Sequence, residues 1–439
     1  MISRIKKIIP KALFKLYHYL LALAANFFYG SPSDKLIVIG VTGTSGKSTV
    51  AYLITRILEK AGFRVGCSST VMFKVNKREW LNDKKVTMVG RFALQKLIKS
   101  MVAANCQYAV IETTSQGIEQ FRHLGINYDV LVLTNLYPEH IEAHGSFANY
   151  KNAKLKLFKK LETEAPKLMA GVKVKKAIVV NLDDEHAPDF VQPAAEEKYG
   201  FTLKNNFLDQ VKSLRADLAA ATATGVEFTV GLQKFQVPRY GWHNIYNSLA
   251  AVTVGLSQGL SLKSMAEGLA DLPPLPGNFE KIEAGQPFKI FVDYAFEPKA
   301  VAALYEIVKA LPHQKIIHVL GSTGGGRDRA RRPILGELAG QNADYVIVTN
   351  EDPYDDDPQI IIDEVAAGAA KAGKKINQNL FKVLDRRAGI TKALSLAAAG
   401  DVVLITGKGC EQAIVVKNNK KIPWDDRRVA REELEKLDG

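Results

Sequence analysis

Cysteine is scarce in this sequence of 439 residues, which holds only Cys67, Cys106 and Cys410. These three residues lie far apart, and no two of them form a CxxC pair. The pattern argues against a disulfide framework and a structural zinc site, and it favours a reducing compartment, the cytoplasm. Low-complexity tracts and internal repeats are also missing, while 47% of the residues are hydrophobic. A disordered chain is therefore excluded, and the length suits two large domains.

Acidic residues are missing from the first 33 positions, whose basic residues are Arg4, Lys6, Lys7, Lys11 and Lys15. An uncharged, mainly apolar stretch then runs from Leu16 to Ser33. A secretory signal would look similar, but the glycine-rich loop described below follows directly and belongs inside the cell. Two interpretations stay open for residues 1–33: an interfacial helix in peripheral contact with the inner face of the membrane, or a helix packed on the first domain.

The chain as a whole is basic, because 59 Lys and Arg residues against 46 Asp and Glu residues give a net charge of +13. Such a charge suits nucleic acid, an anionic membrane surface or phosphorylated substrates, and it does not choose among them. A nucleic-acid translocase would show salt-dependent binding of DNA or RNA. The motifs below favour a phosphorylated small molecule, and we expect no nucleic-acid partner.

Short apolar runs alternate with helical patterns, which is typical of parallel sheets with crossover helices. The first series of runs lies at 36–40, 108–113, 130–135 and 177–181, and the second at 289–295, 316–321, 345–350 and 402–407. Between the two series, residues 271–277 contain three prolines and are the best candidate linker. We predict an α/β chain with a basic and apolar N-terminal segment (1–35), a P-loop parallel-sheet ATPase domain (36–273) and a Rossmann-like α/β domain (274–439).

The first apolar run leads into the glycine-rich sequence Val41-Thr-Gly-Thr-Ser-Gly-Lys-Ser-Thr49, and an amphipathic helical pattern follows. A phosphate-binding loop requires strand, loop and helix in this order. Backbone N–H groups of such a loop surround phosphate oxygens, Lys47 neutralises the β- and γ-phosphates, and Ser48 can bind Mg²⁺. We therefore predict a nucleotide site formed by Gly43, Thr44, Ser45, Gly46, Lys47, Ser48 and Thr49.

Two further groups are expected at the same edge of the sheet, because Glu112 ends one apolar run and His140 follows the next. The carboxyl ends of parallel strands meet at one edge, where α/β proteins bind ligands. A carboxylate and an imidazole there can bind Mg²⁺ that bridges ATP and an attacking carboxylate. Taken alone, the histidine could equally be a loop residue without a ligand.

One lysine stands out in the helical pattern at 147–158. Lys154 projects from the middle of an apolar face that includes Phe147, Tyr150 and Leu157. Apolar surroundings disfavour the charged form of an amine, and a neutral amine can react with carbon dioxide. A lysine whose ammonium group extends to the solvent is the alternative interpretation.

The stretch from Gly40 to Thr49 resembles the ATP loop of the Mur ligases, which join amino acids to peptidoglycan precursors. Glu112-Thr-Thr-Ser115 and Glu139-His-Ile-Glu-Ala-His-Gly145 resemble the family's E-V-S-S and D-H-x-x-x-H-G patterns. The resemblance implies that Ser48, Glu112 and His140 bind Mg²⁺. It also implies that Lys154, within Tyr150-x-x-Ala-Lys-x-x-Leu-Phe158, is a carbamylated lysine that holds a second Mg²⁺.

The resemblance also assigns substrate contacts. Asn244 and Asn247 match asparagines that approach the adenine, and Asp293 and Arg327 match contacts to ATP. The positions that match a muramoyl-peptide site are Thr87, Thr114, Ser115, Gln120 and Arg122. The positions that match the amino-acid site of the branch that adds the third residue are Glu351, Asp352, Tyr354 and Glu411.

Several positions depart from the family pattern. Tyr354 replaces the arginine of D-N-P-R, which is expected to grip a second carboxylate, so diaminopimelate is disfavoured against lysine, ornithine or a neutral amino acid. Cys410 replaces the histidine of G-K-G-H-E, Phe296 replaces the histidine of D-Y-A-H, and Asn278 replaces the arginine of P-G-R-x-E. Only about 35 residues precede the first strand, too few for the UDP-binding domain usual in this branch. A lipid-linked acceptor is therefore an alternative to a UDP-linked one.

The resemblance implies an ATP-dependent, ADP-forming ligase that adds an amino acid to a muramoyl-peptide cell-wall precursor through an acyl phosphate. Its expected cofactors are ATP, two Mg²⁺ ions and a lysine carbamate. The alternatives are a ligase of the folylpolyglutamate or cyanophycin type, which uses another glutamyl-type acceptor, and a non-ligating P-loop binding protein.

Overall fold

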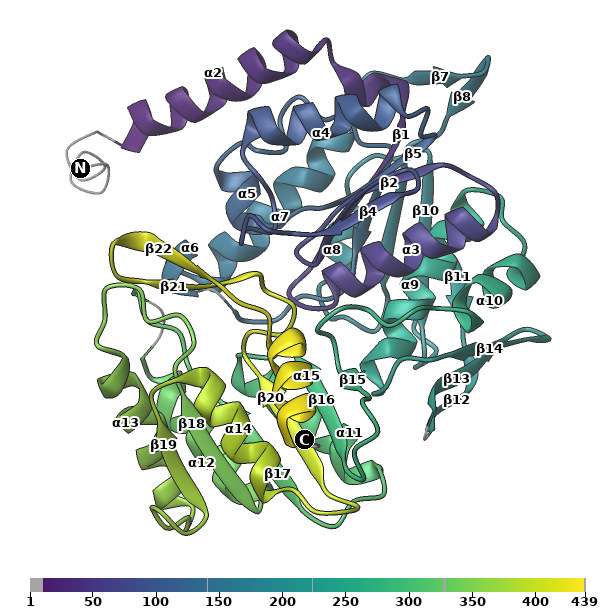
Figure 1. The fold of residues 1–439 in the computed structure, drawn as a ribbon. Helices are drawn as coiled ribbons and strands as arrows, with labels where there is room; N and C mark the ends of the chain where they lie inside the picture. Colours follow the sequence, from purple (N-terminus) through teal and green to yellow (C-terminus); the bar gives the residue numbers. More distant parts are fainter. Residues whose placement is uncertain (1–10, 140, 223, 327–328, 438–439) are drawn as a thin grey trace. The chain divides into compact units, whose positions relative to one another are not determined.

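The structure, a computed structural model, describes residues 11–139, 141–222, 224–326 and 329–437. The chain divides into two compact units, Met1–Leu272 and Pro273–Gly439, and each is built around its own sheet (Figure 1). Both units are α/β, as the alternation of apolar runs and helical patterns predicts.

A sheet of nine strands forms the centre of the first unit, in the order β11-β10-β9-β6-β1-β5-β2-β3-β4. Its strands are β1 (Ile37–Thr42), β2 (Val65–Ser68), β3 (Met72–Val75), β4 (Arg78–Leu81), β5 (Tyr108–Glu112), β6 (Val130–Leu133), β9 (Ala177–Asn181), β10 (Glu197–Thr202) and β11 (Lys212–Arg215). The strands pair in parallel except at one edge, where β2, β3 and β4 are antiparallel. This edge differs from the purely parallel sheet that the sequence predicts, because the short turns between these strands leave no room for crossover helices.

Helices cover both faces of this sheet. Helices α3 (Lys47–Lys60), α9 (His243–Ser257) and α10 (Leu262–Ala270) pack together, whereas α4 (Arg91–Ala103), α7 (Phe147–Leu161) and α8 (Ala187–Val191) share one apolar core with the opposite face. The shorter elements are η1 (Pro32–Lys35), α5 (Ser115–Glu119), α6 (Ile141–His144), the hairpin of β7 (Lys167–Met169) and β8 (Val172–Val174), and an antiparallel sheet of β12 (Asp217–Thr222), β13 (Gly225–Val230) and β14 (Gln233–Val237).

The register of the central strands brings the loop after β1 and the polar residues that end or follow β5 and β6 to one edge of the sheet. Strand β1 pairs in parallel with both β5 and β6, with Val41 opposite Glu112 and Thr42 opposite Leu133. The loop after β1, the carboxylate that ends β5 and the polar residues after β6 therefore leave the sheet side by side.

The first described helix, α2 (Lys11–Tyr29), packs beside α4. Ala22 and Ala25 are buried, and Phe28 and Tyr29 contact the ring of Phe92 with centroid distances of 6.2 and 6.3 Å. Within the part of the chain that the structure describes, no helix combines the length and apolar character needed to cross a membrane.

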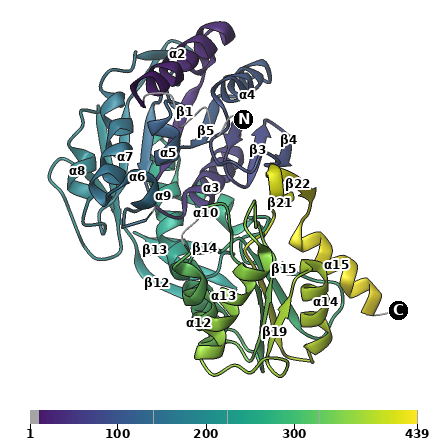
Figure 2. The ribbon, with the colours of Figure 1, turned by 90° about the vertical axis from the view of Figure 1, so that its left-hand side faces the viewer.

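The second unit holds a six-stranded sheet in the order β15-β16-β20-β17-β18-β19. Its strands are β15 (Glu280–Ile282), β16 (Lys289–Asp293), β17 (Ile316–Leu320), β18 (Tyr345–Thr349), β19 (Leu380–Val383) and β20 (Val402–Thr406), followed by a hairpin of β21 (Ala413–Val416) and β22 (Lys420–Pro423) around η2 (Lys417–Asn419). Figure 2 shows the helices on its two faces: α12 (Arg331–Asn342) and α13 (Pro358–Lys371) on one, α14 (Arg386–Leu396) and α15 (Asp426–Leu437) on the other. Helix α11 (Pro298–Ala310) packs beside α12.

Candidate active site

The loop between β1 and α3 has a backbone shape that depends on glycine. Gly43 and Gly46 have φ angles of 149° and 78°, which side chains other than glycine rarely adopt. A Cβ atom on Gly46 would lie 2.4 Å from Oδ1 of Asn247 on α9, so the loop also needs the small residue for space. The backbone N–H of Ser45 donates to Oδ1 of Asn135 at 2.9 Å. These contacts hold the loop in a concave shape suited to phosphate.

Two lysines converge on this loop. Lys47 Nζ donates to the carbonyl oxygens of Gly43 at 3.2 Å and Thr44 at 2.8 Å, while Lys154 Nζ donates to the Gly43 oxygen at 2.7 Å. Lys154 comes from α7, on which it is the most deeply enclosed lysine, with 1% of its surface exposed. The structure thus joins two residues that lie more than a hundred positions apart in the chain, as their predicted roles require.

Glu112 is a nearly buried carboxylate that faces the loop. It is 2% exposed, and it accepts hydrogen bonds from Ser48 Oγ at 2.9 Å, Thr70 N at 2.8 Å and Thr70 Oγ1 at 3.1 Å. A carboxylate beside a serine hydroxyl is the oxygen-rich pair that suits Mg²⁺ when substrate phosphates complete its coordination. Among the described residues there is no group of three or more Asp, Glu, His or Cys side chains that could hold a metal without such phosphates.

The surroundings of Lys154 disfavour its charge. Burial lowers the pKa of its amine well below the usual value, the nearby ammonium of Lys47 lowers it further, and Glu112 partly opposes both. Its Nζ lies 4.6 Å from the ring centroid of Tyr150, whose hydroxyl donates to Thr44 Oγ1 at 3.1 Å. Among the described residues, no carboxylate lies within ion-pair distance of this amine. The structure therefore holds a lysine that favours the neutral form beside the phosphate loop.

The two predicted adenine contacts lie together on α9. Asn247 Nδ2 donates to Asn244 Oδ1 at 2.9 Å, and Asn244 Nδ2 donates to the Tyr240 carbonyl at 2.6 Å. Both asparagines are buried, and Asn247 adjoins Gly46 as described above. Their amides are already engaged within the protein, so any contact to a base must use their remaining donor and acceptor positions.

Three of the predicted acceptor residues lie close to Glu112, namely Thr87 in space and Thr114 and Ser115 along the chain. Thr87 Oγ1 is 2.8 Å from Thr70 Oγ1, which itself donates to Glu112. Thr114 caps α5 by accepting a hydrogen bond from the Gly117 N–H at 3.0 Å, and Ser115 Oγ lies 3.0 Å from His144 Nε2. The capping threonine has a structural role, whereas the serine hydroxyl contacts His144, which lines a cavity described below.

A pair of arginines lies on the same side of the unit. Arg122 Nη1 donates to the Met88 carbonyl, and Arg91 Nη2 donates to the carbonyl of Gln120. Burial lowers the pKa of both guanidinium groups, and the charge of Arg122 lowers that of Arg91 further. The Nε atoms of both are buried without a hydrogen-bond partner among the described residues. Neighbouring cations with unsatisfied donors suit an anionic ligand.

The predicted residues of the second unit group around Lys408, which is fully buried. Its Nζ lies 2.9 Å from Asp352 Oδ1 and also pairs with Glu411. Glu351 is buried nearby and accepts a hydrogen bond from Thr323 at 2.8 Å. Burial raises the pKa of Glu351, opposed by the charges of Arg386 and Lys408.

Two more residues of this unit were predicted as substrate contacts. Tyr354 adopts a φ of 53°, and its ring lies where a Cβ on Gly325 would come within 2.7 Å. Asp293 ends β16 and accepts hydrogen bonds from the backbone N–H groups of Phe279 and Ala295, both at 2.6 Å. Burial raises the pKa of Asp293 to about 6. The predicted ligands His140 and Arg327 lie outside the described residues.

Sequence reasoning missed four residues that the structure places at the site. Thr70 and Arg91 are described above, Thr134 donates through Oγ1 to the Ser45 carbonyl at 2.7 Å, and His144 reaches Ser115. Thr134 directly follows β6, which is the one signal that could have identified it, since polar residues at the carboxyl end of a parallel strand commonly face ligands. Thr70 lies in the turn between β2 and β3, and Arg91 is the first residue of α4, and neither position carries such a signal.

Comparison with known proteins identifies the family. Residues 41–255 match the Mur ligase middle domain, and residues 277–409 match the Mur ligase, glutamate ligase domain. The chain is 38% identical over 425 residues to the UDP-N-acetylmuramyl-tripeptide synthetase of Roseiflexus sp. (strain RS-1), covering 95% of this chain and 82% of that one. It is 33% identical over 427 residues to the UDP-N-acetylmuramoyl-L-alanyl-D-glutamate–2,6-diaminopimelate ligase of Clostridium tetani (strain Massachusetts / E88), covering 95% and 81%.

Solved structures agree with this assignment. One of a UDP-N-acetylmuramoyl-L-alanyl-D-glutamate–2,6-diaminopimelate ligase matches with a TM-score of 0.61 and 26% identity, covering 92% of this chain and 79% of that chain. The folylpolyglutamate synthase of Mycobacterium tuberculosis, complexed with ADP, shares the fold with a TM-score of 0.67 and 17% identity, covering 88% and 91%. The matched domains, the relatives and the geometry of the phosphate loop lead to one conclusion: this chain belongs to the Mur ligase family.

Proposed function

We propose that this protein is an ATP-dependent, ADP-forming ligase that adds an amino acid to a muramoyl-peptide precursor of the cell wall. The observation that carries the proposal is the convergence of Lys47, Ser48, Glu112 and Lys154 on one phosphate-binding loop. The relatives support it, because those quoted above are named as enzymes that act on UDP-linked muramoyl peptides.

The reaction has two balanced steps. An acceptor carboxylate oxygen attacks the γ-phosphorus of ATP, the bond to the bridging oxygen breaks, and ADP leaves. The amine of the incoming amino acid then attacks the acyl carbon, phosphate leaves, and the nitrogen loses a proton to give the amide. Lys47 and the loop N–H groups bind and orient the phosphates.

Metal and carbamate chemistry fit these residues. Ser48 and Glu112 are the described residues that would hold Mg²⁺, which supplies charge neutralisation between ATP and the acceptor. We propose that the neutral amine of Lys154 adds to carbon dioxide, forming an N–C bond and releasing one proton, so that a carbamate faces the loop. That group would be a second anionic oxygen ligand beside Glu112, in keeping with two metal ions.

Carbamylation has its own test. Lys154→Ala should lose most ligation activity, and short carboxylates such as acetate or formate should restore part of it by occupying the space of the lysine carbamate. Lys159→Ala is a matched control, because this exposed lysine lies on the same helix. Full activity of Lys154→Ala without carbon dioxide or added carboxylate would contradict the role of the carbamate.

The acceptor site and the amino-acid site each contain residues that affect which substrate is bound. We propose that Arg122, which matches the muramoyl-peptide site of the family, binds a carboxylate of the acceptor together with the neighbouring Arg91, since two adjacent cations favour an anionic ligand. Tyr354 cannot provide the guanidinium that would grip a second carboxylate of the amino acid, so lysine, ornithine or a neutral amino acid is favoured over diaminopimelate.

Mass spectrometry of products tests the ligase proposal directly. The purified protein would be incubated with Mg-ATP, UDP-N-acetylmuramoyl-L-Ala-D-Glu and a pool of amino acids, with Lys47→Ala as the inactive control. The mass gained identifies the amino acid, and a lipid-linked acceptor is tried in parallel. The absence of product with both acceptors, together with DNA-stimulated ATP hydrolysis, would favour a non-ligating P-loop protein instead.

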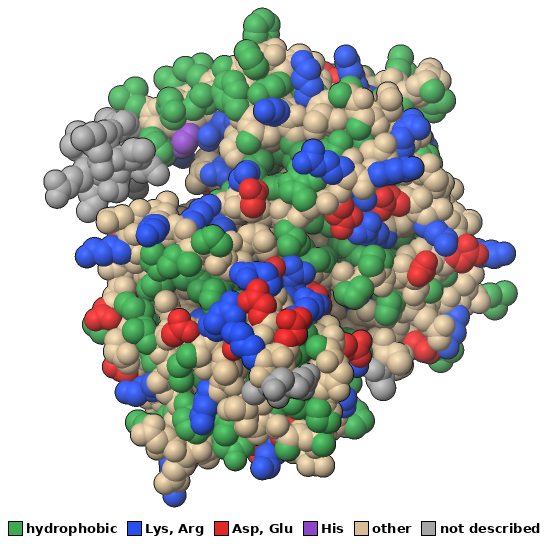
Figure 3. All heavy atoms as spheres, in the orientation of Figure 1, with side chains coloured by type: hydrophobic (Ala, Val, Ile, Leu, Met, Phe, Trp, Pro, Cys, Tyr) green, Lys and Arg blue, Asp and Glu red, His purple; other side chains and the backbone are tan. Residues whose placement is uncertain are grey.

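We also propose that α2 contacts the inner face of an anionic membrane. Its outward face carries Leu13, Leu16, Leu20, Leu23 and Phe27, which are 44–87% exposed, and Figure 3 shows hydrophobic side chains gathered over this helix. The first 33 residues contain no acidic side chain, so their charge complements anionic lipid.

Co-sedimentation with vesicles tests this contact. The protein should bind phosphatidylglycerol-containing vesicles and not neutral ones, and Leu16→Ser/Phe27→Ser should weaken binding at least fivefold. Leu232→Ser, at an exposed turn of β13 and β14, should bind as the wild type does. A concentration-dependent dimer without vesicle binding would show that a second copy covers this face instead.

A further inference from the structure

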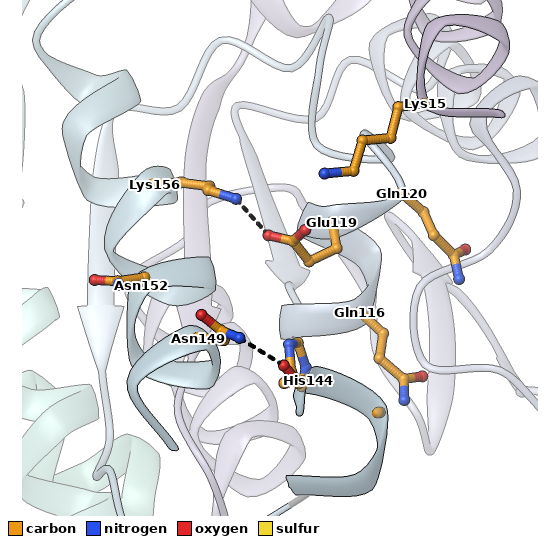
Figure 4. Close-up of a pocket in the computed structure, with 9 residues that line it drawn as sticks. Lys15, Gln116, Glu119, Gln120, His144, Asn149, Asn152 and Lys156 are labelled. Atoms are coloured by element: carbon orange, nitrogen blue, oxygen red, sulfur yellow. Dashed lines mark hydrogen bonds and ion pairs between the residues drawn. The ribbon is translucent and has the colours of Figure 1, made fainter. Parts of the chain in front are cut away.

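A polar cavity of about 680 Å³ lies between α2, α5, α6 and α7 of the first unit (Figure 4). Its lining residues are Lys15, Gln116, Glu119, Gln120, Ala143, His144, Asn149, Asn152 and Lys156. All but one of them carry polar side chains, and the volume lies within the range of small-molecule sites. Such a lining suits a ligand rich in hydroxyl groups and phosphate oxygens, and it does not suit an apolar one.

The polar groups of this cavity are only partly satisfied by one another. Lys156 pairs with Glu119 at 2.6 Å, and Asn149 donates to the His144 carbonyl at 2.9 Å. Figure 4 shows the amine of Lys15 directed into the space near Glu119 and Gln120. Among the described residues, Lys15 makes no ion pair, and Gln116, Gln120 and Asn152 use their side-chain amides in no hydrogen bond. A ligand with several oxygens could therefore engage them without displacing existing contacts.

The position of Lys15 is fixed by the packing of α2. One turn further along this helix, the ring of Tyr19 contacts that of Phe121 edge-to-face, with 5.9 Å between centroids. Phe121 follows Gln120, so this contact sets the helix against the very segment that lines the cavity. Lys15 thereby projects toward the protein, on a different side of α2 from the exposed leucines.

One wall of the cavity is joined to the proposed reaction centre through Ser115. Glu112 ends β5, and three residues later Ser115 begins α5. The hydroxyl of Ser115 lies 3.0 Å from Nε2 of His144, a residue of the cavity wall. An acceptor whose carboxylate reacts beside Glu112 can therefore extend along α5 into this space.

We propose that this cavity binds the phosphorylated glycosyl end of the acceptor, with Lys15 of the N-terminal helix as its phosphate contact. This inference rests on the proposed function for the identity of the ligand. It makes α2 part of the substrate site: one side of the helix supplies a cation to the cavity, while its apolar side faces outward. The glycosyl diphosphate could come from a nucleotide-linked or a lipid-linked acceptor, because both carry the same anionic group.

Calorimetry on the full chain tests the inference without requiring turnover. UDP-N-acetylmuramoyl-L-Ala-D-Glu should bind Lys15→Glu about tenfold more weakly than wild type, the loss expected for one charge-assisted contact. The same peptide lacking the nucleotide diphosphate should bind both proteins equally. Lys159→Glu makes the same charge change on the outer side of α7 and should leave both affinities unchanged. Lys15→Gln should give an intermediate loss, and thermal unfolding checks that each variant folds.

A lipid-diphosphate acceptor in detergent micelles forms the second arm. A Lys15-dependent affinity for only one of the two acceptors identifies the carrier. Equal effects of Lys15→Glu and Lys159→Glu, or an equal loss with the acceptor that lacks phosphate, would overturn the inference. Failure of wild type to bind either phosphorylated acceptor would also overturn it. Lys15-dependent binding without any amide product would instead count against the proposed ligase function alone.

Discussion

A buried histidine at the centre of the second unit should make a pH-dependent contribution to the stability of that unit. His318 lies on β17 with no exposed surface, and its ring nitrogens contact the Tyr305 hydroxyl at 2.5 Å and Thr406 Oγ1 at 2.9 Å. Burial, and then the charge of Arg386, lowers its pKa to about 3. Because the folded-state pKa lies below that of the unfolded chain, this residue contributes stability that is present above pH 6.5 and is lost as the pH falls toward 3.

The size of the effect follows from the shift in pKa. An unfolded histidine becomes almost fully protonated between pH 7.5 and 5.0, whereas the buried one does not, so the free energy of unfolding should fall by about 2 kcal/mol. Asp293 acts in the opposite direction, because burial raises its pKa to about 6 and its protonated form favours the folded state. That carboxyl offsets about 1.4 kcal/mol over the same interval. The wild-type unit should therefore change little in stability, although two titrating groups contribute.

Replacing the histidine separates the two contributions. His318→Gln keeps one hydrogen-bonding group and removes the titration, so its unfolding free energy should rise on acidification relative to wild type by about 2 kcal/mol. The assay is hydrogen exchange measured by mass spectrometry on peptides covering β17 and β20, at both pH values. Tyr305→Phe is the matched control, because it removes a hydrogen-bond partner and leaves the titrating ring. Parallel pH profiles for wild type and His318→Gln would refute the reasoning.

Three further changes test other parts of the structure. Gly46→Ala should abolish ADP binding in calorimetry, because the φ of Gly46 is 78° and an added Cβ would lie 2.4 Å from an asparagine oxygen. Gly62→Ala is the control and should keep ADP binding, since Gly62 has a φ of 91° but open space around it. Asp129→Asn should destabilise the first unit by about 3–5 kcal/mol in urea, because it leaves two buried lysines without their carboxylate, whereas Asp217→Asn at a surface pair should cost under about 1 kcal/mol. Tyr354→Arg should raise the kcat/KM ratio for diaminopimelate over lysine about tenfold in competition assays, and an unchanged ratio would show that this position does not select the amino acid.

The apolar runs predicted the strands well, because strands that are buried on both faces have continuous hydrophobic sequences. The run at 402–407 became β20, and the run at 177–181 became β9 with the same bounds. The hairpin of β3 and β4 gave no such signal, since β4 is short and half exposed at the sheet edge. Its fold depends on pairing with β2, which no local pattern reveals.

At the candidate active site, the sequence predicted those residues whose position follows from the order of the strands or from helical periodicity. Glu112 reached the phosphate loop because parallel strands share a carboxyl edge, and Lys154 did so because helical periodicity placed it on the inward face. Thr70 was not predicted. It lies in a turn, and it reaches Glu112 only because the strand before it pairs with β5. Contacts of this kind depend on tertiary structure and have no periodicity to read.

The N-terminal helix has two faces of different character. Its sequence allowed either a membrane-facing helix or one packed on the first domain, and the structure gives α2 both a packed face and an exposed apolar face. Ala22 and Ala25 are buried, while Leu20 and Phe27 are 54% and 87% exposed. Lys15, two helical turns before Ala22, lies on the packed side of the helix and projects into the cavity beside α5. Periodicity assigns residues to sides of a helix, but only the packing of neighbouring helices decides which side meets protein, ligand or solvent. If α2 binds both lipid and acceptor, loss of its outer leucines should leave the affinity for a soluble acceptor unchanged, whereas loss of Lys15 should leave vesicle binding nearly unchanged.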